Sequence, residues 1–476
     1  MLSTRNTLLL SLKTLILIFL VGYMLWSLSA CRKPFNFKEA GSLSFSTDSV
    51  KFDTIFTTLP SPTRVLVFRN TSPNHLRIKN ISLQNGDASD FRLIINGDAA
   101  QSMSDFELAK GDSAYIFISF NSNLKDALST DRLIFETQDQ AQSVVLAAYI
   151  RDAWFLQDTF VACDTTFTND KAIVVDGPLF VPEGCTLTIQ PGTHLYFTSR
   201  KDESFTPASY LIVSGTLKVT GTHTDPVIFE GNRLDESYAE KGGQWLGLYF
   251  TKNSSGSEIR HAIIKNAIFG VRTDSLALNA QPKVRLTQTW IRNMEYYGIW
   301  MVGFASPGDQ TPVILGENIL VSNCAKQALR VDGGGIGVFR HCTMASYNYD
   351  FNRKDPLIFL NNYGTQFAYP LNISFYNSVV HGTEKSEVKL DDAGIAGAFT
   401  LLFDHCLLRQ EDNLPGSNNI YSTEPGFTDS RNRDFRPTAN SALIDKGTNL
   451  SIFTDLANEI RPRLNGYDIG CYEFQP

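Results

Sequence analysis

The chain has 476 residues, a formal net charge of -7 and a composition rich in Phe (33), Gly (33) and Tyr (17). This acidic balance disfavours binding to nucleic acid or to anionic lipid by electrostatic attraction, and the length leaves room for two or more cores. Short alternating segments between turn residues dominate the sequence, and no long amphipathic helix with capping signals interrupts them. The pattern predicts an all-β protein.

The first thirty residues have the parts of an export signal. Two cations precede an apolar run at residues 14–28, and the segment contains no Asp or Glu. Leu28-Ser29-Ala30-Cys31 then resembles the lipobox of bacterial lipoproteins. The resemblance implies that residues 1–30 are a signal peptide and that Cys31 carries the lipid. A retained transmembrane anchor is the alternative, because the apolar run approaches the length that spans a bilayer.

Either alternative places the rest of the chain outside the cytoplasm. Removal of residues 1–30, which contain two cations and no carboxylate, takes the net charge from -7 to -9. We expect an exported protein that is anchored to the outer membrane through Cys31, with residues 31–40 as a tether. Arg32 and Lys33 after the lipid site favour the periplasmic side, while the cell surface stays open as an alternative.

Residues 41–152 contain seven or eight short alternating segments, such as residues 50–56, 64–68 and 114–120. This number and spacing of strands predict a β-sandwich. The region has no Cys and no Trp, so it lacks the core of an antibody domain. It resembles the immunoglobulin-like modules that precede other domains in envelope lipoproteins of Bacteroidota-type bacteria, which implies a spacer or a docking surface.

Residues 153–476 follow a different pattern, which repeats. Six residues (hydrophobic, any, Asn/His/Gln, small, hydrophobic, hydrophobic) recur so that the polar position returns every 23 to 36 residues. Such periods with short strands predict a solenoid of parallel β-coils around one core. Equivalent polar side chains then stack about 4.8 Å apart and can hydrogen-bond from coil to coil. The predicted structural ladder consists of His261, Gln288, Asn318, His341, Asn377 and His405.

The coil pattern resembles the right-handed parallel β-helix of the pectin-lyase-like superfamily, which implies a fold and no particular activity. The C-terminal motifs 441–447, 461–463 and 467–473 look like the choice-of-anchor segment that closes many secreted bacterial β-helix proteins. Because the end of a solenoid exposes strand edges, residues from about 425 to 476 are expected to form a cap. Asp445, Arg461 and Asp468 are expected to form a polar lock within it.

Six cysteines remain besides Cys31. Cys163 and Cys185 lie 22 residues apart, and a disulfide between them is possible in an exported protein. Cys324, Cys342 and Cys406 lie next to polar ladder positions and are expected to be buried free thiols. Their spacing does not indicate zinc, and the sequence predicts no metal site and no cofactor.

The residues after each coil-opening Gly or Ala suggest a binding face. Alternation along the strands puts Tyr249, Arg272, Trp300 and Arg330 in one outward column. Aromatic rings offer flat faces to sugars and Arg holds carboxylate or sulfate groups bidentately, so the column fits an extended anionic polysaccharide. The alternative is a ladder of cation–π contacts and salt bridges on a solvated face.

These patterns predict a lipid-anchored cell-envelope protein that presents its β-helix for glycan binding, adhesion or envelope scaffolding. Its expected partners are the membrane and a polysaccharide or an envelope protein, and no nucleic acid. The alternative is a polysaccharide lyase or glycoside hydrolase that acts on an anionic polysaccharide through Asp274 and Asp332. The motif sets of polygalacturonases and pectate lyases are missing except for Asp391-Asp392, so the non-enzymatic role is favoured.

Overall fold

The structure is a computed structural model that describes residues 36–57, 59, 61–199, 207–235, 237–364, 367–395, 398–421 and 423–476. The proposed lipobox and Cys31 lie outside the described residues. Within these ranges the helices are two 3-10 turns, η1 (Gly86–Ala88) and η2 (Ser430–Asn432), and all other elements are strands. No helix in the described part is long and apolar enough to cross a membrane. The prediction of an all-β protein is confirmed.

The chain divides into two compact units. Among the described residues, unit 1 comprises those of 36–52, 61–122 and 128–148, and unit 2 comprises those of 53–59, 123–127 and 149–476.

Two sheets account for the strands at the N-terminal end of the chain. One contains β1 (Phe37–Lys38), β5 (His75–Leu83), β10 (Ala127–Glu136), β11 (Ala141–Arg151), β3 (Ser49–Phe56) and β8 (Ser102–Leu108). The other contains β2 (Leu43–Phe45), β4 (Arg64–Asn70), β9 (Ser113–Phe120), β6 (Phe91–Ile95) and β7 (Asp98–Ala99). Alternate residues of β4 are buried, and the ring of Phe68 in β4 lies 5.1 Å from that of Phe135 in β10. Rings from both sheets therefore meet on the buried side.

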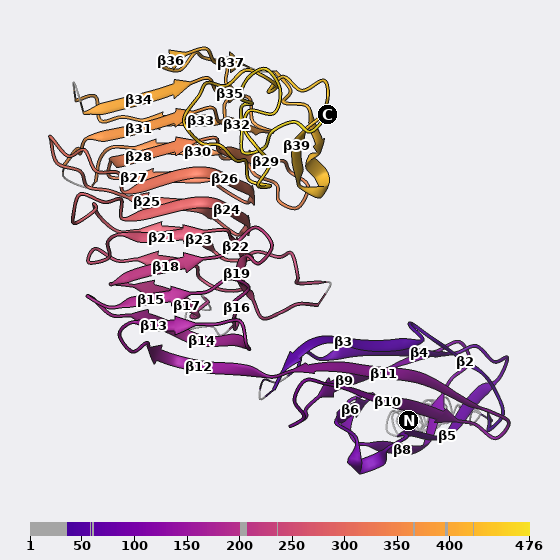
Figure 1. The fold of residues 1–476 in the computed structure, drawn as a ribbon. Helices are drawn as coiled ribbons and strands as arrows, with labels where there is room; N and C mark the ends of the chain where they lie inside the picture. Colours follow the sequence, from indigo (N-terminus) through magenta and orange to yellow (C-terminus); the bar gives the residue numbers. More distant parts are fainter. Residues whose placement is uncertain are drawn as a thin grey trace, which may run out of the picture. The chain divides into compact units, whose positions relative to one another are not determined.

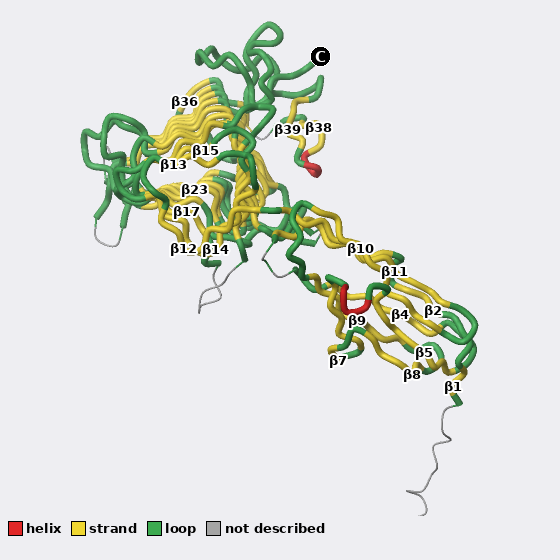
Figure 2. Tube along the Cα trace, turned by 60° about the horizontal axis from the view of Figure 1, so that its bottom comes forward, coloured by secondary structure: helices red, strands yellow, loops and turns green. Residues whose placement is uncertain are grey.

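Unit 2 is dominated by a 26-stranded sheet whose strands stack as coils (Figures 1 and 2). Each strand pairs in parallel with its equivalent one coil later, as β15 does with β18 and β18 with β21. The arrangement is compatible with a β-helix solenoid. The first side of the coils contains β15 (Thr186–Ile189), β18 (Thr216–Thr220), β21 (Ser257–Arg260), β24 (Val284–Met294), β26 (Ile314–Cys324), β28 (Gly335–Arg340), β31 (Leu371–Tyr376), β34 (Phe399–Asp404) and β36 (Gly416–Ser417).

We name the other two sides by what lies outside them. The open flank is the outward face of β17 (Tyr210–Val213), β20 (Leu248–Phe250), β23 (Phe269–Thr273), β25 (Tyr297–Val302), β27 (Leu329–Asp332), β30 (Ile358–Asn361) and β33 (Val388–Asp391). The strapped flank is the outward face of β16 (His194–Phe197), β19 (Val227–Gly231), β22 (Ala262–Lys265), the second halves of β24 and β26, β29 (Thr343–Ser346), β32 (Val379–Gly382), β35 (Leu407–Leu408) and β37 (Ile420–Tyr421). The coils begin with β12 (Ala153–Phe160), β13 (Thr165–Phe167) and β14 (Ala172–Val181).

The coils share one apolar core in which equivalent residues stack. The rings of Phe339, Phe375 and Phe403 occupy the same register position, with centroids 4.8 and 5.0 Å apart. These distances match the spacing of about 4.8 Å between neighbouring strands. One side chain per coil at each position therefore builds a continuous column.

Four of the six ladder residues stand at corners between two strands, Gln288 and Asn318 lie at the equivalent corners within β24 and β26, and all six have a positive φ. The left-handed backbone conformation is costly for most residues and is tolerated best by Gly, Asn, Asp and His. Repeated use of amide and imidazole side chains therefore reflects the backbone of the corner as well as coil-to-coil bonding. Their φ angles lie between 47° and 52° for His261, Gln288, Asn318, His341, Asn377 and His405.

The C-terminal strap, residues 427–476, includes β38 (Phe427–Asp429) and β39 (Asp434–Pro437). Its Leu456 and Cys471 pack with Leu320 of β26, and its Leu443 and Ile469 pack with residues of β32 and β35. Figure 1 shows this yellow segment beside β29, β32 and β35. The strap lies along a flank of several coils, and this position differs from the expected cap at the coil end. The outward column of this flank is apolar, so the strap buries it.

Candidate binding face on the open flank

The four predicted outward residues lie in one column of the open flank. Tyr249 pairs with Arg272, Arg272 with Trp300, and Trp300 with Arg330 in the parallel register. Phe359 and Lys389 continue the same column by one residue each. We call these six residues the aromatic–cation column, because aromatic and cationic side chains alternate from coil to coil.

Cation–π contacts connect the column. The Arg272 guanidinium lies 4.2 Å from the ring centroid of Trp300 and 4.9 Å from that of Tyr249. Arg330 lies 4.8 Å from the Phe359 ring, and the Lys389 ammonium lies 6.0 Å from it. Such contacts contribute about 0.5–1 kcal/mol at exposed sites. They hold the rings and cations in fixed positions along the flank.

Asp274 and Asp332 accept hydrogen bonds from residues of this column. Arg330 donates to Asp332 through Nε (2.7 Å) and Nη2 (2.9 Å), and Trp300 Nε1 donates to the same carboxylate at 2.8 Å. Asp274 accepts hydrogen bonds from Arg272 and from the Tyr249 hydroxyl. Burial and this carboxylate raise the pKa of Tyr249 to about 12, so its hydroxyl stays a donor. Each proposed catalytic carboxylate is thus engaged by an Arg and an aromatic residue.

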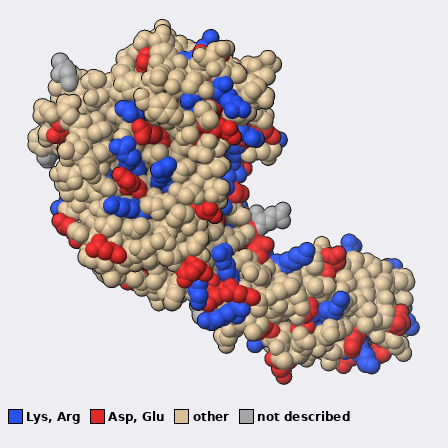
Figure 3. Space-filling view, in the orientation of Figure 1, with Lys and Arg blue, Asp and Glu red and all other residues tan. Residues whose placement is uncertain are grey.

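The column remains partly accessible. The side chains of Arg272 and Arg330 are 30% and 28% exposed, and those of Asp274 and Asp332 are 31% and 29% exposed. Charges of both signs are also interspersed on the face of the coils that Figure 3 shows. From Tyr249 to Arg330 the column therefore presents rings and neutralised ion pairs, instead of a field of one sign.

Lys389 breaks the charge pattern of the column. Each cation of the column is followed two residues later by Asp, and Asp391 is the partner expected for Lys389. Asp391 instead accepts hydrogen bonds from the Tyr363 hydroxyl (2.8 Å) and Asn361 Nδ2 (3.3 Å). No ion pair of Lys389 occurs within the part of the chain that the structure describes. Lys389 is therefore the cation of the column whose charge the neighbouring Asp does not neutralise.

The polar ladder differs from the column in its surroundings, because the strap covers its middle rungs. Asn318 Nδ2 donates to Gln288 Oε1 at 3.2 Å and to the backbone oxygen of Thr454 at 2.7 Å. Asn377 Nδ2 lies 3.0 Å from His341 Nε2 and donates to the backbone oxygen of Thr448 at 2.6 Å. These side chains bond both to the next rung and to the strap, which fits a structural role.

The end rungs of the ladder have other surroundings. His261 is 5% exposed and lines a cleft of about 630 Å³ together with Lys218 and Arg260. Burial and the charge of Arg260 lower the pKa of His261 to about 4. His405 Nδ1 lies 3.2 Å from a carboxylate oxygen of Asp404.

A buried ion pair holds the strap. Arg461 donates to Glu473 at 2.6 Å, with side chains 0% and 1% exposed, and also donates to Asn318 at 3.2 Å. Asp468 and Asp445 accept backbone N–H groups, at 2.7 Å from Asp445 and from Gly466 respectively. The structure brings the three expected lock residues together, and Glu473 is the carboxylate partner that the sequence pattern does not single out.

The cysteines divide into two groups. Cys163 and Cys185 form a disulfide with their Cα atoms 4.6 Å apart. Cys324, Cys342 and Cys406 are buried free thiols, as is Cys471. Among the described residues, no group of three or more His, Cys, Asp or Glu side chains could hold a metal ion.

Comparisons with known proteins give little further information. No protein-family model matches the chain, and no curated protein matches it. One similar solved structure is that of the Vibrio cholerae VesB protease, with 14% sequence identity and a TM-score of 0.17. The match covers 23% of this chain and 31% of that chain, so the chain spans less than a third of that structure's length.

Proposed function

We propose that this protein is a lipid-anchored protein of the bacterial cell envelope that holds an extended glycan on its open flank. In this proposal residues 1–30 are a signal peptide, Cys31 carries the lipid, and the sheets of residues 41–152 form an immunoglobulin-like sandwich that acts as a spacer. The coils are a right-handed parallel β-helix with a choice-of-anchor segment at its C-terminal end. Adhesion or envelope scaffolding follows from holding a glycan at a membrane.

The observation that carries the proposal is the register of the aromatic–cation column. Six equivalent side chains rise by about 4.8 Å per coil, so successive aromatic rings lie about 9.6 Å apart. An extended chain of sugar rings can follow such a straight, periodic stripe. Partly exposed rings provide flat apolar faces, and the Arg–Asp pairs provide donors and acceptors for hydroxyl groups.

The ion pairs also specify how the glycan is held. Asp274 and Asp332 occupy the guanidinium groups that otherwise bind carboxylate or sulfate bidentately. Stacking on Tyr249, Trp300 and Phe359 then contributes more than ion pairing. The proposed ligand class is therefore an extended glycan, and a negative charge on it is not required.

A glycan array probed with the full chain tests the proposal. We expect retention of at least one class of extended glycan, and Trp300→Ala should weaken it about tenfold because one stacking platform is lost. Tyr296→Ala is a matched control, since Tyr296 is an exposed ring with its own cation, Lys326, outside the column.

Two results would contradict this function. Equal loss of retention in Trp300→Ala and Tyr296→Ala would mean that the column is not the binding face. Release of new reducing or unsaturated ends, abolished by Asp332→Asn, would favour the hydrolase or lyase alternative.

A further inference from the structure

The last strand of the open flank, β33, has a free edge. It pairs with β30 on one side, and in the final coil residues 409–415 form a loop where another strand of this flank would stand. Ile358 N–H donates to the Glu387 carbonyl at 2.9 Å. Because peptide groups of a strand alternate between its two sides, those of Val388 and Leu390 point away from β30.

A side-chain amide occupies part of this edge. Val388 N–H donates to Gln410 Oε1 at 3.0 Å, and Gln410 Nε2 donates to the Val388 carbonyl at 3.2 Å. Gln410 is 7% exposed. Its amide thus takes the place of a peptide group of a following strand at Val388, and the edge remains open at Leu390.

Leu390 is an inward residue that lacks a cover. It follows Val331 and Leu360 in the same register column, and both of those are fully buried. Leu390 is 39% exposed. An apolar side chain and an outward-facing peptide group therefore meet at the same point of the edge.

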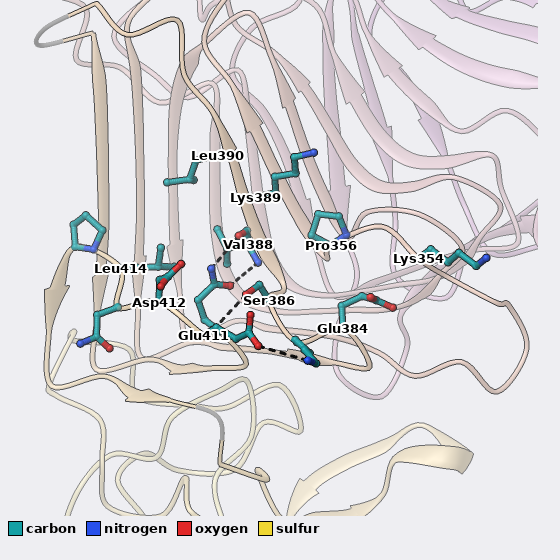
Figure 4. Close-up of a pocket in the computed structure, with 14 residues that line it drawn as sticks. Lys354, Pro356, Glu384, Ser386, Val388, Lys389, Leu390, Glu411, Asp412 and Leu414 are labelled. Atoms are coloured by element: carbon teal, nitrogen blue, oxygen red, sulfur yellow. Dashed lines mark hydrogen bonds and ion pairs between the residues drawn. The ribbon is translucent and has the colours of Figure 1, made fainter.

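A cleft of about 690 Å³ runs along this edge (Figure 4). Figure 4 shows Val388, Lys389 and Leu390 of β33 together with Asp412 and Leu414 of the following loop around it. We call it the edge cleft. Glu411 of its wall lies 3.9 Å from Lys385, whereas the described residues form no ion pair with Lys389 or Lys354.

We infer that the edge cleft binds an extended peptide segment of a partner protein, which adds a strand to β33. The N–H and C=O groups of Leu390 pair with the peptide backbone, and an apolar side chain of the peptide covers Leu390. The residue beside Lys389 is aromatic or acidic, because the column alternates rings with cations and Lys389 lacks a neutralising carboxylate. This site does not use the rings of Tyr249 or Trp300, but it adjoins the proposed glycan face at Lys389, which belongs to the aromatic–cation column.

A peptide is favoured over a glycan at this point by the geometry of the edge. A strand backbone presents a donor and an acceptor together with side chains that alternate between the two faces. Those features match the open peptide group of Leu390 with its apolar side chain on one face and Lys389 on the other. A sugar chain offers hydroxyl groups without an apolar side chain to fill the space above Leu390.

Hydrogen exchange of the full chain tests this inference. The probe is the peptide Pro-Leu-Ile-Phe-Leu-Asn-Asn, which copies residues 356–362, because Phe359 and Leu360 pair with Lys389 and Leu390 in the native register. The probe should slow exchange in residues 388–391. A peptide with Pro in place of its first Asn lacks the backbone N–H that donates to the Leu390 carbonyl in this parallel register, and should bind about tenfold more weakly.

Two variants test the site in opposite directions. Leu390→Glu should weaken binding of the probe about tenfold, because it removes the apolar contact. Gln410→Ala should strengthen binding, because it frees the Val388 peptide group, and a variant that merely unfolds would not show this. Trp300→Ala should leave probe binding unchanged even if it abolishes glycan retention.

Unchanged exchange at saturating probe, or equal binding of the Pro-containing peptide, would overturn the inference. Slowed exchange in residues 388–391 with a sulfated oligosaccharide in place of the probe would show that the edge cleft belongs to a glycan site instead.

Discussion

The strapped flank and the open flank are built by the same coils, yet the C-terminal strap covers the first and leaves the column of the second partly exposed. On the strapped flank, Leu320 and Val379 lie under the C-terminal strap, which also bonds to the ladder through Thr448 and Thr454. On the open flank, the aromatic–cation column bonds to itself and stays partly exposed. Repetition places side chains in columns on both flanks, and the cover decides whether a column becomes core or surface.

The two flanks also place the same chemical pair in different surroundings. Arg461–Glu473 is buried, whereas Arg330–Asp332 is about a quarter to a third exposed. Breaking a buried pair leaves an uncompensated charge, while an exposed pair is screened by water. The comparison can therefore be tested by removing equivalent residues from each flank.

Arg461→Ala should have the largest effect on stability. It leaves Glu473 buried without its partner, so the free energy of unfolding should fall by about 3–5 kcal/mol. Urea unfolding of the full chain measures this change. Arg436→Ala is the matched control, because Arg436 pairs with Asp434 in the same strap but is 61% exposed. Equal losses in both variants would show that burial does not distinguish them.

Acid should weaken the coils through the buried ladder histidines. The folded chain lowers the pKa of His261 from 6.5 to about 4, chiefly by burial, so below about pH 6.5 the unfolded chain binds more protons. Stability should therefore fall as the pH decreases from about 6.5 to about 4, by on the order of 3 kcal/mol from this residue.

The variant His261→Asn tests this sign, because Asn tolerates the same left-handed backbone. Its unfolding free energy should depend less steeply on pH than that of the parent chain across this range. Parallel curves for the two proteins would contradict the assignment.

The left-handed corner conformation of the ladder should have a smaller effect on the free energy of unfolding. Asn377 has φ 47°, a region that costs an alanine about 1–2 kcal/mol but is free to glycine. Both Asn377→Ala and Asn377→Gly lose the bonds to Thr448, so their difference isolates the backbone. Thermal unfolding should show Asn377→Gly to be the more stable of the two. The reverse order would mean that the corner relaxes out of this conformation.

Arg330→Ala on the open flank should have the smallest effect. The pair with Asp332 is partly exposed to solvent, so the unfolding free energy should change by about 0–1 kcal/mol. Urea unfolding beside Arg461→Ala provides the direct comparison. A loss as large as that of Arg461→Ala would mean that the column is part of the architecture and not a surface free to bind a ligand.

Much of the fold follows from local sequence. The ladder positions are predictable because a left-handed corner favours the same few side chains in every coil, and His341 and Asn377 match the pattern although they lie 36 positions apart. That long coil also explains why Phe359 escapes notice, and Lys389 escapes notice because Glu387 stands where the earlier coils have Gly or Ala. Leu357 stands where the earlier coils have Gly or Ala, so the strand that begins at Ile358 lacks its usual signal.

The sequence by itself determines an all-β chain, the coil period and the residues that share a column. Only the tertiary structure decides which columns are covered, because the cover comes from remote residues. Gln288 bonds to Asp455 across 167 positions, and Arg461 reaches Asn318 across 143. The same holds for the edge of β33, which is open because the final coil passes it as a loop. A repeating pattern specifies its own period but cannot specify what packs outside it.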